Sequence, residues 1–219
     1  MISFEEIKKN EAIKKYISKA DESLIALGYT EHSFAHVNKV ANTAKYILET
    51  LNYSAKEIEL AQIAGYLHDI GNLVNRIDHA QSGAVMAFRI LDNLGFDADE
   101  IATIVTAIGN HDEGTAEAVN AVAAALILGD KTDVRRSRVR NSTISTFDIH
   151  DRVNYSVYRS ELSFQNNNSE LVLILDIDTN YGTVMDYFEI FMTRMLLCRK
   201  AAQKLNVKFR LIINGQQVM

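Results

Sequence analysis

Four histidines and two aspartates occupy positions at which metal chemistry could be carried out. The stretch YLHDIGNLVNRIDHAQSG, residues 66–83, places His68 next to Asp69, follows them with Gly71, and adds His79 ten residues after the aspartate. Imidazole and carboxylate are ligands of zinc, iron, manganese and nickel. The remaining donors of these types are His36 near the start of an expected helix, His111 after Gly109 at the end of another, and Asp130 after Gly129 in the apolar run AVAAALILGD.

Six donors exceed the need of a single tetrahedral ion, so the set predicts two divalent transition-metal ions, with manganese, iron, nickel and zinc as the candidates. A carboxylate can bridge two such ions while the histidines cap each one. Two ions polarise phosphoryl oxygens and supply a hydroxide at neutral pH, because the pKa of a bound water falls from about 16 towards about 7. The donors therefore predict a hydrolytic site without a Ser or Cys nucleophile.

Helices must position these donors, because the apolar residues up to residue 138 recur at spacings of three and four. Ser3 with Glu6 and Ser54 with Glu57 fit the capping box that starts a helix. Glycines 28, 71, 95 and 109 each follow a periodic stretch, where positive φ would end a helix. Facing helices of a bundle commonly supply metal ligands. The expected helices are 3–27, 33–51, 55–70, 80–94, 98–108 and 117–138.

The pattern changes after about residue 150. NYSVYRSELSF and LVLILDID are rich in β-branched and aromatic residues, and the polar segment QNNNSE joins them like a hairpin loop. A helical segment and the alternating segment VKFRLII follow. We therefore expect a mainly α protein, with a helical domain at 1–150 that holds the metal site and a small α+β (β-β-α-β) annex at 151–219. The annex has no ligand cluster, and packing, dimerisation and a lid are all open roles for it.

The order of the six donors, read with the segments around them, resembles the HD-domain superfamily of metal-dependent phosphohydrolases. The similarity covers residues 30–140 and includes SFAHVNKVANTA, AGYLHDIG, HAQSGA and GNHDE. The two additional histidines resemble the binuclear members, among them hydrolases of bis(5′-nucleosyl) tetraphosphates and cyclic-di-GMP phosphodiesterases. The resemblance implies an HD-domain-like helical bundle, with His36, His68, Asp69 and Asp130 on one ion, and Asp69, bridging and catalytic, with His79 and His111 on the second.

Several residues near these donors are candidates for binding substrate. Many binuclear members have a lysine where this chain has Asn72, which can hydrogen-bond a phosphate oxygen but cannot neutralise it, and Arg76 can compensate. The basic run KTDVRRSRVR follows Asp130; it is either a solvated helix face or a source of phosphate ligands. His32, four residues before His36, either touches substrate or makes a hydrogen bond at the helix start. The candidates from the run are Lys131, Arg135 and Arg136.

The composition excludes several other classes of protein. A net charge of −5 argues against non-specific nucleic-acid binding. There is no run of about 18 apolar residues and no signal-peptide pattern, so we expect a cytoplasmic protein without a membrane partner. The single cysteine, Cys198, is expected to be a buried apolar residue rather than a catalytic one. A homo-oligomer remains open.

These observations predict a phosphohydrolase or phosphodiesterase in which a metal-bound hydroxide attacks a nucleotide or a similar small phosphoester. Two alternatives stay open. The same ligands occur in HD-type di-iron oxygenases, which activate O₂ instead of water. A non-catalytic sensor could also relay nucleotide binding to a partner through the annex.

Overall fold

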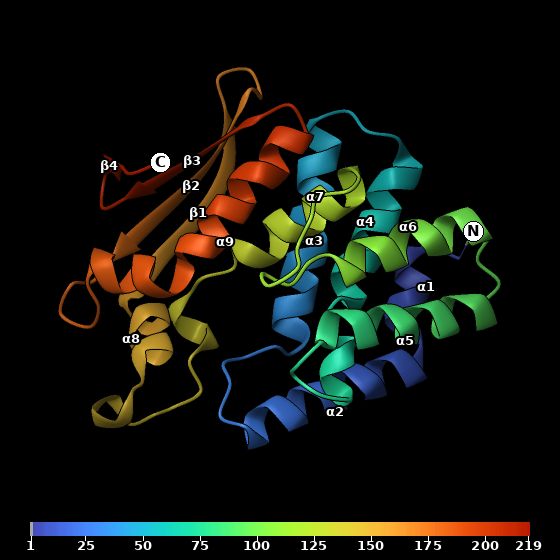
Figure 1. Cartoon of the computed structure of the whole chain (residues 1–219), viewed down its shortest axis with the longest axis horizontal. Coiled ribbons are helices and arrows are strands. Elements are labelled where there is room, and N and C mark those ends of the chain that lie inside the picture. The colour runs from blue at the N-terminus through green and yellow to red at the C-terminus, as the bar shows by residue number, and fades with distance from the viewer. Residues whose placement is uncertain (1) are drawn as a thin grey trace.

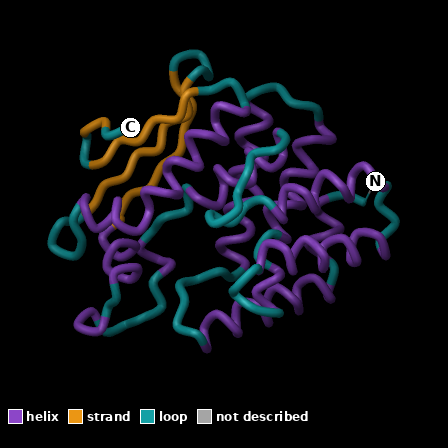
Figure 2. Tube along the Cα trace, viewed as in Figure 1, coloured by secondary structure: helices purple, strands orange, loops and turns teal. Residues whose placement is uncertain are grey.

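Helices α1 to α7 form the N-terminal part of the protein, and the strands lie in the C-terminal part (Figures 1 and 2). The computed structural model describes residues 2–219. This arrangement confirms the expected mainly helical chain with a small C-terminal sheet. The helices are α1 (Phe4–Lys9), α2 (Glu11–Ala26), α3 (Phe34–Thr50), α4 (Ala55–Leu67), α5 (His79–Asn93), α6 (Ala98–Gly109) and α7 (Ala121–Lys131). Shorter elements are the 3-10 turns η1 (Ile70–Leu73), η2 (Arg136–Arg138) and η3 (Ile144–Thr146), and the helix α8 (Ile149–Ser156).

Side-chain caps set the helix boundaries. Both predicted capping boxes are present, at the starts of α1 and α4. The single helix expected over 3–27 is wrong, because Asn10 ends α1 and its side chain accepts the N–H of Ile13 to start α2. An Asn side chain competes in this way for backbone groups and favours a cap over a helix interior. The helix expected over 117–138 is also too long, since Asn120 caps α7 and the helix ends at Lys131.

The glycines that follow the helices serve two different purposes. Gly28 and Gly95 each have a φ of 80°, as expected of residues that end a helix in the left-handed region. The same explanation is wrong for Gly71 and Gly109, which are not among the positive-φ residues of the described chain. Gly71 instead lies where η1 approaches the backbone of α5 too closely for a side chain.

Helix α7 lies at the centre of the helical part. Every residue from Val122 to Lys131 is buried. The helix packs against α3, α4, α6 and α9. A helix that is apolar around its whole circumference is buried on all sides, in contrast to the amphipathic helices α3 and α6 beside it. The aspartate near its C-terminal end, Asp130, is thereby placed inside the protein.

The C-terminal part contains β1 (Val157–Gln165), β2 (Glu170–Ile177), α9 (Val184–Lys204), β3 (Lys208–Ile213) and β4 (Gln216–Gln217). The expected β-β-α-β order is confirmed, and β4 extends it by a short strand. The sheet order is β1-β2-β3-β4, with β2 and β3 parallel and the other pairs antiparallel. The predicted hairpin loop joins β1 to β2 through three asparagines in the left-handed region, residues 166–168.

Helix α9 lies beside the sheet and also packs against α7 (Figure 1). Its buried residues, including Phe191, Met195 and Cys198, belong to one hydrophobic cluster that also contains residues of α7 and of the sheet. The expected buried position of Cys198 is confirmed. The boundary expected between residues 150 and 151 falls inside α8. The annex therefore shares its hydrophobic core with the helical part. This packing brings side chains of α9 close to those of the helical part.

Within residues 2–219, none of the helices combines the length and the apolar character needed to span a membrane.

Candidate metal centre

Four histidines are held by the ring nitrogen that faces away from the centre of the site. In each, Nδ1 lies within hydrogen-bond distance of a backbone carbonyl oxygen two or three residues earlier. A carbonyl oxygen only accepts, so Nδ1 carries a proton and donates it, and in the uncharged ring Nε2 keeps the free lone pair with which imidazole binds a metal. The pairs are His32 with Thr30 at 2.7 Å, His68 with Gly65 at 2.8 Å, His79 with Arg76 at 3.1 Å and His111 with Ile108 at 2.6 Å.

His36 is oriented by a carboxylate instead. Its Nδ1 lies 2.8 Å from Oδ2 of Asp133, a residue that is 1% exposed. Lys39 and Arg135 each contact the other oxygen of Asp133 at 2.9 Å. Burial raises the pKa of Asp133, but the hydrogen bond to His36 and the charge of Arg138 lower it far more. The sequence analysis missed this residue, and its one available signal was that Asp133 is the only acid in the basic run KTDVRRSRVR.

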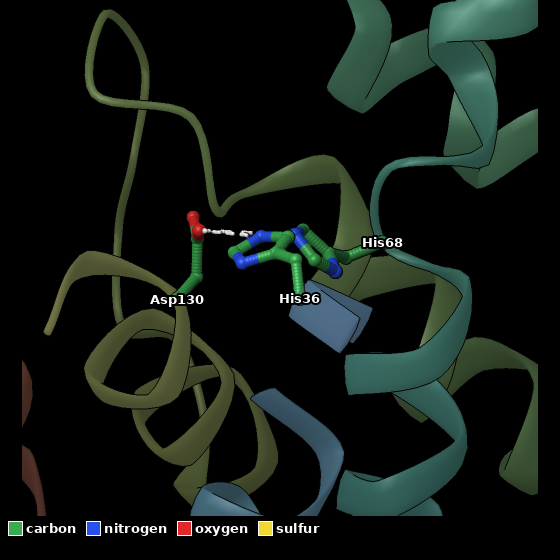
Figure 3. Close-up of side chains that lie close together, drawn as sticks. All are labelled: His36, His68 and Asp130. Atoms are coloured by element: carbon green, nitrogen blue, oxygen red, sulfur yellow. Dashed lines mark hydrogen bonds and ion pairs between the residues drawn. The ribbon is translucent and has the colours of Figure 1, made fainter. Parts of the chain in front are cut away.

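The Nε2 atoms of His36 and His68 face each other and lie beside the carboxylate of Asp130 (Figure 3). The carboxylate of Asp69 lies close to the same two nitrogens. The two nitrogens are 3.3 Å apart. Nε2 of His36 lies 3.4 Å from Oδ1 of Asp130 and 3.5 Å from Oδ2 of Asp69, and Nε2 of His68 lies 3.7 Å and 3.2 Å from the same atoms. Burial lowers the pKa of His68, but Asp69 and Asp130 raise it overall. The two carboxylates thus favour a positive charge at this point.

Asp69 has an oxygen that the protein does not satisfy. Its Oδ2 is buried, and no described residue donates a hydrogen bond to it. Burial raises the pKa of Asp69, whereas His68 lowers it well below its ordinary value, so the group is an anion. A buried anionic oxygen without a donor is costly unless a cation lies beside it. The residues of this site therefore fit a divalent metal ion.

The second oxygen of Asp69 faces a different histidine. Oδ1 lies 3.6 Å from Nε2 of His79, whose ring centroid is 5.1 Å from that of His111. The donors form two close groups, His36 with His68 and Asp130, and His68 with Asp69 and His111; within each group the ligand atoms lie within 4.8 Å of one another. His79 belongs to neither group. A carboxylate whose two oxygens face different histidines is suited to bridge two ions.

Two of the buried histidines, His79 and His111, favour the uncharged form that a metal requires. Burial and the charge of His68 lower the pKa of His111 to about 3. Burial also lowers the pKa of His79 and outweighs the opposite effect of Asp69. An uncharged imidazole with a fixed tautomer does not have to lose a proton before it binds a metal.

A cavity of about 350 Å³ opens beside these donors. Asp69, His79, His111 and Asp130 form part of its wall. Volumes of roughly 300 Å³ and above are typical of small-molecule sites. The wall also contains other ionisable groups of both signs. The basic ones are Arg76, Lys131, Arg138 and Arg194, and the acidic ones are Asp148 and Asp151.

Three of the predicted substrate-binding residues line this cavity, namely His32, Arg76 and Lys131. Arg76 donates to Oδ1 of Asn72 at 3.3 Å, and its guanidinium lies 5.6 Å from the ring centre of Tyr29. Nζ of Lys131 lies 2.6 Å from Oδ2 of Asp130. Burial lowers the pKa of Lys131, but Asp130 and Glu113 raise it overall. Lys131 therefore stays charged in the wall.

The other three predicted residues do not line the cavity. Asn72 is 2% exposed and donates to Oδ1 of Asp69 at 3.0 Å, so it holds the carboxylate in place. Arg135 binds Glu31 and Asp133. Arg136 lies over the rings of Tyr155 and Tyr181 at 4.5 and 5.6 Å. The basic run is thus neither a solvated helix face nor a set of neighbouring phosphate ligands, because the chain leaves α7 at this point and its side chains diverge.

The C-terminal part supplies cavity residues that the sequence analysis did not predict. Arg194 and Phe191 come from α9, and His150, Asp151 and Asn154 come from α8. No local motif identifies them, since their role depends on how α8 and α9 pack against the helical part. Of the roles left open for the annex, packing is the one that the structure documents.

Residues 33–151, from the start of α3 to within α8, match the HD domain family. An uncharacterized protein of Methanocaldococcus jannaschii is 27% identical over 182 aligned residues, which cover 73% of this chain and 70% of that protein. The crystal structure of a predicted HD superfamily hydrolase from an uncultured Thermotogales bacterium has 24% sequence identity, covers 57% of this chain and 67% of its own, and superposes with a TM-score of 0.45.

Proposed function

Because the chain belongs to the HD-domain family, we propose that it is a metal-dependent phosphohydrolase that acts on a nucleotide or a similar small phosphoester. Members of this superfamily are typically hydrolases. We further propose that the site holds two divalent transition-metal ions. In this proposal His36, His68, Asp69 and Asp130 hold one ion, and Asp69 with His79 and His111 holds the other.

One observation carries the proposal, and it is the buried oxygen of Asp69 that no donor satisfies. Oδ2 of Asp69 accepts no hydrogen bond from the described residues, although Nε2 of His68 lies only 3.2 Å away. A buried anionic oxygen without a donor is costly unless a cation lies beside it. This supports a site built around a metal rather than a set of core histidines.

When bound, two divalent ions would polarise phosphoryl oxygens and supply a hydroxide at neutral pH. The protein's own residues prepare the site for that chemistry. Lys131 pairs with Oδ2 of Asp130 and leaves Oδ1 facing His36. Asn72 fixes Asp69 through Oδ1. Arg76 and Lys131 place positive charge in the cavity wall, where it stabilises the charge that develops on a transferring phosphoryl group.

The test measures metal content by elemental analysis and phosphate release, both for the native chain and for Asp69→Ala. The matched control is Asp92→Ala, which replaces an exposed aspartate on α5. We expect close to two transition-metal ions per chain in the native protein and in Asp92→Ala, and loss of both ions and of turnover in Asp69→Ala. Phosphate release is measured with a panel of nucleotides and other phosphoesters, under argon and in air.

Each alternative predicts a different result. Manganese-supported phosphate release under argon excludes the oxygenase, whereas oxygen-dependent turnover with bound iron favours it. Tight nucleotide binding without turnover under any metal supports the sensor. Hydrolysis that persists in Asp69→Ala would refute the proposed role of the site.

A further inference from the structure

Helix α9 brings a cation into the cavity from outside the segment that matches the family. Arg194 lines the cavity wall together with Lys131 and Arg138. The family match ends at residue 151, and α9 begins at Val184. The three cations therefore come from three separate parts of the chain, α7, η2 and α9.

Arg194 is held firmly at one side of its guanidinium. Nε forms an ion pair with Oε1 of Glu113, and the guanidinium lies 4.6 Å from the ring centre of Phe191. Nζ of Lys131 lies 3.4 Å from the same oxygen of Glu113. Beyond this ion pair, none of the residues 2–219 accepts a hydrogen bond from the guanidinium. A guanidinium fixed at Nε presents its two terminal nitrogens as a fork, the geometry that suits phosphate oxygens.

The cations around the cavity also repel one another. Arg138 is 4% exposed and donates to the backbone oxygens of Glu31 and Asp133 at 3.0 and 2.9 Å. Burial lowers the pKa of Arg138, Asp133 opposes this, and the nearby charge of Arg194 lowers the pKa further. Acidic partners offset part of this repulsion in the free protein, and an anion bound between the cations offsets more of it.

We propose that Arg194 is a substrate-binding residue that donates hydrogen bonds to phosphate oxygens in the cavity. The inference rests on the proposed function, since it assigns a ligand group within the same site. It also gives the C-terminal part a task, because α9 then completes the substrate site that the family segment leaves open on one side. Glu113 acts as a positioning residue through its ion pair with Arg194.

Binding of inorganic phosphate to the full, metal-containing chain tests the proposal by isothermal titration calorimetry. We expect Arg194→Gln to weaken phosphate binding about 10-fold or more, since a hydrogen bond between two charged groups is lost. Arg194→Lys keeps the charge and its pairing with Glu113 but lacks the fork, so its loss should be smaller. The matched control is Arg199→Gln, an exposed arginine on the same helix, which should bind phosphate as the native chain does.

Two further readouts separate this inference from a structural effect and from the proposed function. Metal content and the melting temperature should be the same in the native chain and in Arg194→Lys. Native phosphate affinity in either Arg194 variant overturns the inference, even if hydrolysis is observed. If the chain hydrolyses no phosphoester but Arg194→Gln still weakens phosphate binding, the anion site stands and the proposed function fails.

Discussion

Replacement of Gly71 by alanine should disrupt the metal centre, because no space exists for a methyl group. A Cβ built at Gly71 would lie 2.0 Å from the backbone oxygen of His79 and 2.4 Å from the backbone nitrogen of Gly83. Ordinary contacts begin at 3.4 Å, so η1 and α5 would have to separate by as much as 1.4 Å. Both atoms belong to the backbone, so no side-chain rotation can relieve the clash.

The cost follows from that geometry. Overpacking costs roughly 1–3 kcal/mol where side chains can adjust, and a clash with two backbone atoms should cost about 3 kcal/mol or more. For a chain of this size, about 3 kcal/mol corresponds to a fall in melting temperature of roughly 6–12 °C. Because η1 follows Asp69 directly and α5 starts with His79, the same displacement pulls these two donors apart. Gly71→Ala should therefore also lose metal.

Thermal unfolding and elemental analysis check this prediction, with Gly109→Ala as the matched control. A Cβ at Gly109 meets only the Cβ of Ala84, at 3.6 Å, which is an ordinary contact. We expect Gly109→Ala to keep its metal and to melt at the native temperature or slightly above it, since alanine in a helix restricts the unfolded chain. A Gly71→Ala protein with native melting temperature and metal content would refute the reasoning.

Three further predictions concern other parts of the chain. Asp133→Asn removes the carboxylate that orients His36 and should weaken metal binding about 10–100-fold, as measured by metal titration; unchanged affinity would show that the contact does not matter. The pKa of Asp97 is lowered by the backbone N–H of Glu100 at the start of α6. The contribution of Asp97 to the free energy of unfolding is therefore complete above an unfolded-state pKa of about 3.9 and is lost as the pH falls through the folded-state pKa. In unfolding experiments, Asp97→Asn should therefore lose less stability on acidification than the native chain does. Burial raises the pKa of the Cys198 thiol, so it should react with a thiol reagent after unfolding and not before; rapid labelling of the native protein would contradict this position.

Local signals in the sequence were enough to single out the six candidate metal donors. Residue type and order at HDIG and at the helix ends gave all six donors, and the structure brings His36, His68, Asp69 and Asp130 to one point. Their role as metal ligands stays a prediction. The protonation of Nδ1 also depends on local contacts, since Nδ1 of His68 and of His111 donates to a carbonyl oxygen three residues earlier in the chain.

Substrate-binding residues were harder to predict because their role depends on contacts between distant segments. Asp133 lies 97 residues from its partner His36. The charge pattern beside Asp130, together with the spacing of a helix expected to reach residue 138, assigned its neighbours Arg135 and Arg136 to substrate. Both arginines point elsewhere, since α7 ends at Lys131 and the helical spacing that supported them no longer applies.

The sequence by itself determined most of the helices and strands, but not the break at Asn10 or the helix α8, whose last three residues were expected in a strand. It also determined which faces are apolar and which side chains could bind metal, because periodicity, caps and residue chemistry are local properties. Only the tertiary structure explains why position 71 requires a glycine, and only the tertiary structure determines which cations surround the cavity. The close approach of η1 to α5 and the packing of α9 against α7 arise from burying apolar faces together. Burial of apolar surface is non-directional, so the apolar pattern of a helix does not specify which other element it packs against. The sequence therefore indicates that Arg194 lies on a partly buried helix, but not that this helix places Arg194 at the cavity.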